Sequence, residues 1–376
     1  MQEGGGVSNG NGGLGSGGCS YMPVVEEYDD EEECAGLEPF FFDEAEAVAD
    51  HERRMRREQE AARKEELRVL AMKAINDVKA RILDEDPKQG GKYYNRFCFA
   101  DFSKFDLDEE SPLEPMRNTD RVYKKGNEYS LLPAVNIFSV KIASSDVGFP
   151  IHVYGTAIAR DNLEEKCVFL FNRDKDHYQL INSEDESLIL SGPKRGLVLL
   201  DPVYVEIDLK IKDHQGQEEK ELSKGFLTIG GVANRVLSNY SKVESRSLAT
   251  RLSTVEVMYA VVNYAVEATI AIEVLQGEFY GKITACITSI PNNCLVLHDS
   301  KVAGMMNGDG KGVIQLLRRV VSVCLAEKLS VTIVAQTGDE GTIDFAPDTN
   351  GGGKGEITVG ATTMLVKVTW SVNDEV

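Results

Sequence analysis

Five histidines are the first residues to weigh for chemistry, because histidine is a common general acid or base near neutral pH. None of them stands near a Ser or Cys in a hydrolase-like pattern. His152 lies on the polar side of an alternating segment, His298 ends another segment, and three lie in charged stretches: His51, His177 and His214. We therefore predict no catalytic residue and no cofactor site from these side chains.

A second candidate chemistry is calcium binding between Asn172 and Asp176, where Asp174 and Asp176 have an Asp-x-Asp spacing. Such a loop at the end of a β-sandwich holds calcium in some membrane-binding domains, so a calcium-dependent lipid binder is one alternative function. The adjacent Arg173 and Lys175 offset the negative charge that the cation needs. The sequence favours a plain charged turn and predicts no metal site.

Glycine-rich stretches at Gly308–Gly312 and Gly192–Gly196 resemble phosphate-binding loops at first sight. A phosphate loop needs a helix start and a Ser or Thr after its Lys, and neither stretch has them. Both read as turns, and we expect Val313–Leu317, which follows the first, to form a strand. The long polar, Ser-rich stretch Gly230–Leu248 reads as a loop.

The seven cysteines are scattered and odd in number, without a CxxC pair, which is typical of free thiols in a reducing compartment. We therefore expect no disulfide, although Cys286 and Cys294 flank a turn at Pro291–Asn293 and a cross-strand contact is open to them. The N-terminus has no basic-then-apolar leader, and no uncharged apolar run is long enough to span a bilayer. The expected location is intracellular, either cytoplasmic or nuclear.

The formal net charge is −20, and none of the segments 1–86, 87–130 and 131–376 is net basic. Nucleic-acid binding and docking on anionic lipid both need an excess of Lys and Arg, so we expect neither. The basic cluster Arg53–Arg57 is an alternative import or RNA-binding patch. Interleaved glutamates favour a solvated helix face instead.

The N-terminal third divides into three segments of different composition. Residues 1–42 are rich in glycine and then in acids, which predicts a disordered tail in which Phe40–Phe42 is a candidate partner-binding element. Residues 43–85 predict one long charged α-helix with an apolar stripe from Leu67 to Ile82, and pairing of this helix as a coiled coil is a lesser alternative. Residues 86–130 are rich in aromatics and predict an extended strap whose rings dock on the main domain.

Residues 131–376 predict an antiparallel β-sandwich domain. Its clearest strand is Val203–Lys212, where apolar residues alternate strictly with Tyr204, Glu206, Asp208 and two lysines. Only a strand places the five apolar residues on one side, so we expect this strand to have one buried face and one wet face. Comparable alternation recurs at Val266–Val274 and Met364–Val372, with turn residues between the strands. The chain is thus mainly β, as one large sandwich or two sheets sharing a core.

Three stretches of this sequence are distinctive in wording: LSGPKRGLVLLDPVYVEIDLKIK (190–212), RLSTVEVMYAVV (251–262) and GVIQLLRRVVSV (312–323). They resemble a plant family of the grasses catalogued as domain of unknown function 6598. Some relatives carry this domain beside a ribosome-inactivating rRNA N-glycosidase, which implies a defence or stress context. The glycosidase hallmark Glu-Ala-x-Arg has its nearest string at Glu267–Ile270, which lacks the Arg, and Glu244–Arg246 has the wrong spacing.

The sequence therefore predicts a non-catalytic β-sandwich interaction module with an unknown protein partner. The alternatives are an N-glycosidase-related activity, which needs a Glu and an Arg in one concave pocket, and the calcium-dependent lipid binder. No site residue is predicted for either alternative.

Overall fold

The computed structural model describes residues 43–86, 88, 90–120, 131–212, 220–230, 241–303 and 312–373. The predicted acidic tail with Phe40–Phe42, the histidine at 214 and most of the glycine-rich stretch at 308–312 lie outside these residues. Among the described residues, no helix is both long and apolar enough to cross a membrane.

The long helix α1 runs from Glu44 to Ile82, which confirms the predicted charged helix. Asp43 caps its start, since Oδ1 of Asp43 accepts hydrogen bonds from the backbone N–H groups of Ala45 and Glu46. Along the first half, i,i+4 ion pairs such as Arg54 with Glu58 line the surface. The helix is followed directly by the short antiparallel pair β1 (Leu83–Glu85) and β2 (Lys92–Tyr94).

The predicted apolar stripe of α1 packs only at its C-terminal end. Ile82 is buried, and Val78 and Ile75 pack beside it against a small cluster that contains Phe97 and Phe102. Leu67, in contrast, is 59% exposed, and Leu70, Val69 and Met72 are similarly exposed. Burial of this stripe is therefore local to the last two turns, where the aromatic segment folds back on the helix.

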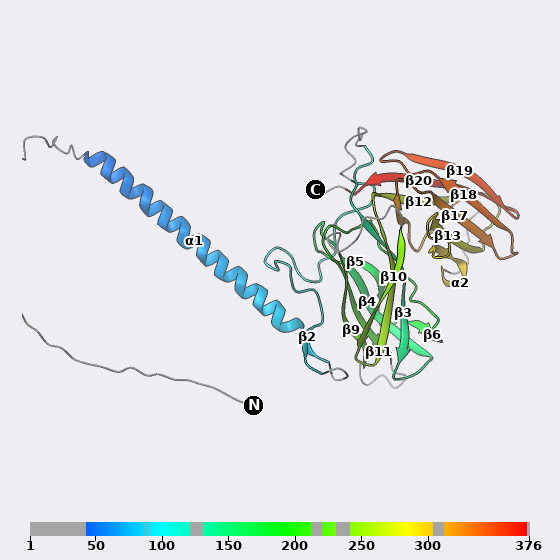
Figure 1. The fold of residues 1–376 in the computed structure, drawn as a ribbon, viewed down its shortest axis with the longest axis horizontal. Coiled ribbons are helices and arrows are strands. Elements are labelled where there is room, and N and C mark those ends of the chain that lie inside the picture. The colour runs from blue at the N-terminus through cyan, green and yellow to red at the C-terminus, as the bar shows by residue number, and fades with distance from the viewer. Residues whose placement is uncertain are drawn as a thin grey trace, which may run out of the picture. The chain divides into compact units, whose positions relative to one another are not determined.

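The strands after residue 131 form two antiparallel sandwiches (Figure 1). The first sandwich packs the sheet β10-β11-β3-β7 against the sheet β5-β4-β8-β9, in which β6 also pairs with β4. Its strands are β3 (Ala134–Ser145), β4 (Ile151–Arg160), β5 (Val168–Arg173), β6 (Gln179–Ile181), β7 (Leu197–Val198), β8 (Val203–Ile211), β9 (Lys220–Ile229), β10 (Lys242–Thr250) and β11 (Ser253–Val262).

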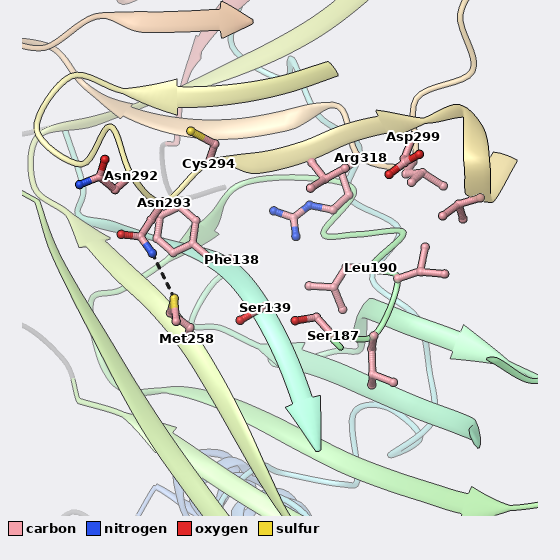
Figure 2. A pocket seen from close by; sticks show the side chains of 15 residues that line it. Phe138, Ser139, Ser187, Leu190, Met258, Asn292, Asn293, Cys294, Asp299 and Arg318 are labelled. Carbon is pink, nitrogen blue, oxygen red and sulfur yellow. Dashed lines mark hydrogen bonds between the residues drawn. The ribbon is translucent and has the colours of Figure 1, made fainter. Parts of the chain in front are cut away.

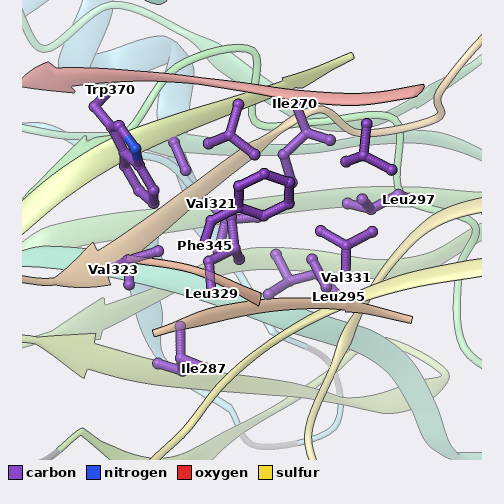
Figure 3. Close-up of a cluster of buried hydrophobic side chains, with 14 of the residues drawn as sticks. Ile270, Ile287, Leu295, Leu297, Val321, Val323, Leu329, Val331, Phe345 and Trp370 are labelled. Atoms are coloured by element: carbon purple, nitrogen blue, oxygen red, sulfur yellow. The ribbon is translucent and has the colours of Figure 1, made fainter. Parts of the chain in front are cut away.

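The second sandwich packs β15-β12-β20-β19, with β16 also on β12, against β14-β13-β17-β18. Figure 3 shows its core, in which Trp370 and Phe345 lie among branched aliphatic side chains. Its elements are β12 (Ala265–Gln276), β13 (Gly281–Ile287), β14 (Leu295–Asp299), the short helix α2 (Ser300–Ala303), β15 (Gly312–Val313), β16 (Val320–Cys324), β17 (Leu329–Ala335), β18 (Glu340–Phe345), β19 (Gly352–Val359) and β20 (Thr362–Val372).

The mainly antiparallel β class is confirmed, but the apolar residues form two cores rather than one. Alternation along a strand identifies its buried face without identifying the sheet that covers that face, so the expectation of a single shared core was wrong. Two local predictions differ as well. The end of the expected loop at 230–248 belongs to strand β10, and the expected strand at 313–317 is only the two-residue β15.

The expected wet face of β8 is a further correction. Glu206 is only 4% exposed, because the segment after β2 covers this side of the strand. Oε1 of Glu206 accepts hydrogen bonds from the Phe97 backbone N–H at 3.0 Å and from Nε of Arg160 at 2.6 Å, and Oε2 accepts one from Nε of Arg96 at 2.8 Å. The segment that carries Arg96 and Phe97 thus contacts β8 through this buried carboxylate, and Phe97 also packs against the ring of Tyr204. Tyr94 and Phe99, in contrast, are 38% and 70% exposed.

The expectation of no disulfide is wrong at one pair. The structure joins Cys286 at the end of β13 to Cys294 just before β14, with their Cα atoms 4.5 Å apart. The turn between β13 and β14 brings the two side chains together, which the scattered cysteine pattern did not reveal. The other cysteines in the described ranges are free and buried: Cys98, Cys167 and Cys324.

Candidate functional site

A cavity of about 350 Å³ lies between the two sandwiches and is the strongest candidate for a binding site among the described residues. Strands β3 and β11 supply one wall, in which Ser139 pairs in register with Met258. The turn between β13 and β14 and the segment between β15 and β16 supply the opposite wall. The lining residues are Phe138, Ser139, Ser187, Leu188, Ile189, Leu190, Met258, Asn292, Asn293, Cys294, Val296, Asp299, Val302, Leu317 and Arg318.

Arg318 is the principal cation of this cavity, and it is only 4% exposed. Figure 2 shows its guanidinium directed into the pocket, with Phe138, Ser139 and Leu190 around it. One N–H donates to the backbone carbonyl of Ile137 at 2.9 Å, whereas Nε has no hydrogen-bond partner. No carboxylate within the described residues forms an ion pair with this guanidinium. Burial lowers the pKa of Arg318 to about 10.

A buried cation without a counter-charge is costly, because the interior does not replace the hydration that the ion loses. Ion pairs compensate the other deeply buried arginines in the described structure, such as Arg160 with Glu206 and Arg195 with Asp161. Arg318 therefore differs from them in having unused donors and an uncompensated charge at the surface of a cavity. An arrangement of this kind attracts an anionic group.

The remaining polar groups of the cavity are placed by short local contacts. The Asn293 side chain donates to Sδ of Met258 at 3.3 Å, which joins the β13–β14 turn to strand β11 (Figure 2). The disulfide at Cys294 fixes the same turn. Asp299 directly precedes helix α2, and its carboxylate accepts a hydrogen bond from the backbone N–H of Lys301. Part of its hydrogen-bonding capacity is therefore used locally.

Three of the four histidines within the described residues make local contacts, and the fourth, His51, is exposed on α1. Nε2 of His298 lies 3.0 Å from Oγ of Ser300, and its Nδ1 lies 3.1 Å from the Gln315 carbonyl oxygen. His152 stacks edge-on against Tyr178, and His177 contacts Asp174. These contacts assign the histidines to turns and packing, and none of them lines the Arg318 cavity.

The candidate calcium loop at Asn172–Asp176 forms a turn that is held by hydrogen bonds to Asp174. Oδ1 of Asp174 accepts the backbone N–H groups of Asp176 and His177, at 2.8 and 2.9 Å. Hydrogen bonding from the His177 side chain is the main reason that the pKa of Asp174 lies below its ordinary value. Asp176 faces Lys212 at 3.8 Å. No group of three or more potential ligands for a metal ion is found among the described residues.

Glu267, from the nearest string to the glycosidase motif, lies on β12 and is only 3% exposed. Its carboxylate accepts the backbone N–H of Gly196 at 2.6 Å and that of Met116 at 2.8 Å. Burial raises the pKa of Glu267 despite these hydrogen bonds and the nearby Arg117 and Arg195. A Cβ atom at position 196 would meet Oε2 of Glu267 at 3.2 Å, so the glycine allows the close approach.

Glu267 therefore ties together three parts of the chain: the strap at Met116, the turn before β7 and strand β12. The neighbouring Arg195 forms a two-point ion pair with Asp161, at 2.6 and 2.9 Å, and both side chains are buried. Asn118 extends this connection, since its side chain donates to the Val372 carbonyl on β20 at 2.7 Å. The conspicuous motif at 190–212 thus supplies structural connections rather than an open reaction site.

Sequence reasoning did not single out Arg318. The pair Arg318-Arg319 before the apolar run of β16 was visible, but nothing in the sequence distinguishes the two arginines. In the structure Arg318 turns into the cavity, whereas Arg319 is half-exposed and lies 3.9 Å from Glu114. Only the packing of the two sandwiches separates their roles.

Comparison with known proteins gives a family for this chain. A family model described as Domain of unknown function (DUF6598) matches residues 134–368. The chain belongs to this DUF6598 family. The matched region begins with β3 and ends within β20, so it includes both sandwiches and the Arg318 cavity.

Curated proteins and solved structures add little to the DUF6598 assignment. No curated protein matches the chain. Among solved structures the chain is similar to human GIVD cytosolic phospholipase A2, with 8% sequence identity, a TM-score of 0.20, and coverage of 63% of this chain and 30% of that chain. The chain thus spans less than a third of the length of that structure, and a likeness at this TM-score carries no argument about fold or activity.

Proposed function

We propose that this chain is a non-catalytic binding module whose Arg318 cavity receives an anionic group of its partner or ligand. The observation that supports this function is the buried guanidinium that lines a cavity between the sandwiches and has no carboxylate partner within the described residues. The cavity volume lies at the lower end of the range for small-molecule sites. Burial removes the hydration of the Arg318 guanidinium, and an anionic group would replace that hydration with charge-assisted hydrogen bonds.

The wider context is proposed from the sequence. The resemblance supports a protein of the grasses with a defence or stress role, and the free thiols of Cys98, Cys167 and Cys324 support a reducing, intracellular location. We propose the same four-part organisation as before: a tail at 1–42, the helix at 43–85, the strap at 86–130 and the β domain at 131–376. The exposed apolar residues of α1 are consistent with a protein partner on the helix.

The binding module is preferred to the two alternatives because of specific contacts. For N-glycosidase chemistry, Glu267 would have to contact a ribose, but its carboxylate is buried and occupied by two backbone N–H groups. For calcium-dependent lipid binding, Asp174 would have to give up the hydrogen bonds that close its turn. Both alternatives thus require local rearrangement, whereas the Arg318 cavity is already formed.

Thermal unfolding of the full chain in different sodium salts tests the proposed function. Acetate, phosphate, phenylacetate and benzylphosphonate are compared with chloride at equal ionic strength. A ligand at ten times its Kd stabilises the folded state by about 1.4 kcal/mol, so at least one anion should raise the Tm of the wild type. The Arg318→Gln variant should lose this rise, and the matched Arg319→Gln variant should keep it. Equal responses of wild type and Arg318→Gln to every anion would contradict the proposal.

A further inference from the structure

The geometry points to a compact apolar monocarboxylate as the ligand of the Arg318 cavity. This inference rests on the proposed function and goes further, because it names the chemical class of the bound group and of the body that carries it. Charge balance, hydrogen-bond geometry, wall composition and volume lead to it independently.

Charge balance favours an anion that carries one negative charge. Arg318 is the one cation in the described lining, and Asp299, a half-exposed carboxylate at the rim, forms no ion pair with it. A monocarboxylate would neutralise the guanidinium. A phosphate monoester carries about −1.5 to −2 near neutral pH, so it would bring excess negative charge into a cavity that already contains Asp299. The free-energy cost of burying an extra negative charge exceeds the gain from one more hydrogen bond to an anion oxygen.

Hydrogen-bond geometry favours a planar acceptor with two oxygens. A guanidinium has five N–H donors in one plane, and its neighbouring donors match the two oxygens of a carboxylate. In Arg318 one N–H of Nη2 donates to the Ile137 carbonyl, and Nε is buried without a partner and out of reach of a ligand. The remaining N–H groups of the two Nη atoms are therefore the donors available to an acceptor in the cavity. The guanidinium thus keeps enough of its fork to hold a carboxylate while it remains anchored to strand β3.

The wall favours an apolar body on the same ligand. Eight of the fifteen lining residues are aliphatic, aromatic or thioether, and a wholly polar body placed against them would lose hydration that they do not replace. Met258 adds an adaptable surface, because its unbranched side chain can adjust to the shape of a ligand. The apolar lining residues are Phe138, Leu188, Ile189, Leu190, Met258, Val296, Val302 and Leu317.

The volume limits the size of the ligand. At the share of about 30 Å³ that one water molecule takes in the liquid, a cavity of about 350 Å³ has room for on the order of ten non-hydrogen atoms. A carboxylate joined to one six-membered ring is of this size. Longer acids, such as fatty acids with long chains, exceed it.

Isothermal titration calorimetry of the full chain tests the class with three probes of similar shape. Phenylacetate has the proposed charge and body, phenylacetamide lacks the charge, and benzylphosphonate replaces the carboxylate by a larger anion. We expect phenylacetate to bind at least about tenfold more tightly than either of the other two, in line with the loss of a charge-assisted hydrogen bond. Because this comparison uses only the wild type, it does not depend on the folding of any variant.

Variants then locate the binding. Arg318→Gln should weaken phenylacetate binding about tenfold or more, Arg318→Lys should weaken it less because the charge remains without the fork, and Arg319→Gln should leave it unchanged. Binding of benzylphosphonate as tight as that of phenylacetate would overturn the carboxylate class and leave the anion site standing. Equal binding of phenylacetamide would overturn recognition by charge. If none of the small anions binds or stabilises the wild type, both the inference and the proposed function fail.

Discussion

Replacing Glu206 by Gln should destabilise the protein strongly, because this side chain is the counter-ion of two arginines. Oε1 and Oε2 of Glu206 lie 2.6 and 3.2 Å from Nε and Nη2 of Arg160, and Nε of Arg96 lies 2.8 Å from Oε2. Burial acts to lower the pKa of Arg96, but the carboxylates of Glu206 and Asp108 outweigh it and hold that pKa above its ordinary value. Glutamine has nearly the same shape but no charge and only one acceptor oxygen.

The structure sets the size of the effect. Removing one partner of a buried ion pair costs about 3–5 kcal/mol, since the other charge stays buried without compensation. Arg160 is 1% exposed, but it keeps hydrogen bonds to the carbonyls of Leu107 and Glu165. We therefore expect a loss near the lower end, about 3 kcal/mol. The Phe97 backbone N–H keeps an acceptor only if the glutamine oxygen faces it.

The matched control is Glu273→Gln, which removes a carboxylate of the same type from an exposed pair. Oε2 of Glu273 lies 2.9 Å from Nζ of Lys367, with both side chains more than a third exposed. An exposed pair contributes about 0–1 kcal/mol, so this variant should stay close to the wild type.

Urea unfolding followed by far-UV circular dichroism measures both variants, and limited proteolysis reports the strap. We expect Glu206→Gln to lower the free energy of unfolding and to expose the segment around Phe97 to cleavage, since that segment loses its anchor on β8. A Glu206→Gln variant that unfolds within about 1 kcal/mol of Glu273→Gln, with the strap still protected, would refute this account of the network.

Three further predictions follow from burial and cross-linking. Because the pKa of Glu267 is raised in the folded protein, the folded state binds a proton at this carboxyl group more tightly than the unfolded chain does. Protonation of Glu267 therefore stabilises the fold fully below its ordinary pKa of 4.5, and this stabilisation is lost as the pH rises through the pKa of the folded state. Urea unfolding at several pH values should show the stability of the wild type falling relative to Glu267→Gln above about pH 4.5, and a relative gain would contradict this. Replacing Cys286 by Ser should cost about 2–3 kcal/mol by the chain-entropy model for a loop with a sequence separation of 8, and equal unfolding curves without reductant would show that the bond is absent. Burial raises the pKa of three free thiols, so iodoacetamide at pH 8 should leave them unmodified until urea is added, as peptide mass mapping would show: Cys98, Cys167 and Cys324.

Local pattern determined most of the secondary structure of this chain. Strict alternation from Val203 to Lys212 identified β8, and the charged run without Pro or Gly identified α1. Both patterns depend only on which face of a regular element meets water, and that information is present in neighbouring residues. The antiparallel class followed from the turn residues between the strands.

Tertiary structure decided everything that depends on residues far apart in the chain. The polar side of β8 looked wet because its cover, the strap that brings Arg96 and Phe97, lies about 110 residues earlier. Three other features also depend on contacts between residues that are not neighbours in the chain and could not be predicted from local pattern: the Cys286–Cys294 bond, the hydrogen bonds of Glu267 to Met116 and Gly196, and the division into two cores.

Arg318 shows the reason most clearly. Its sequence neighbour Arg319 has the same chemistry and nearly the same context, yet one lies in solvent beside Glu114 and the other donates to Ile137 of the first sandwich. Desolvation of a charge depends on the three-dimensional packing around it and not on its position in the sequence. The sequence therefore determined the strands, and the packing of the two sandwiches decided which arginine lines the cavity.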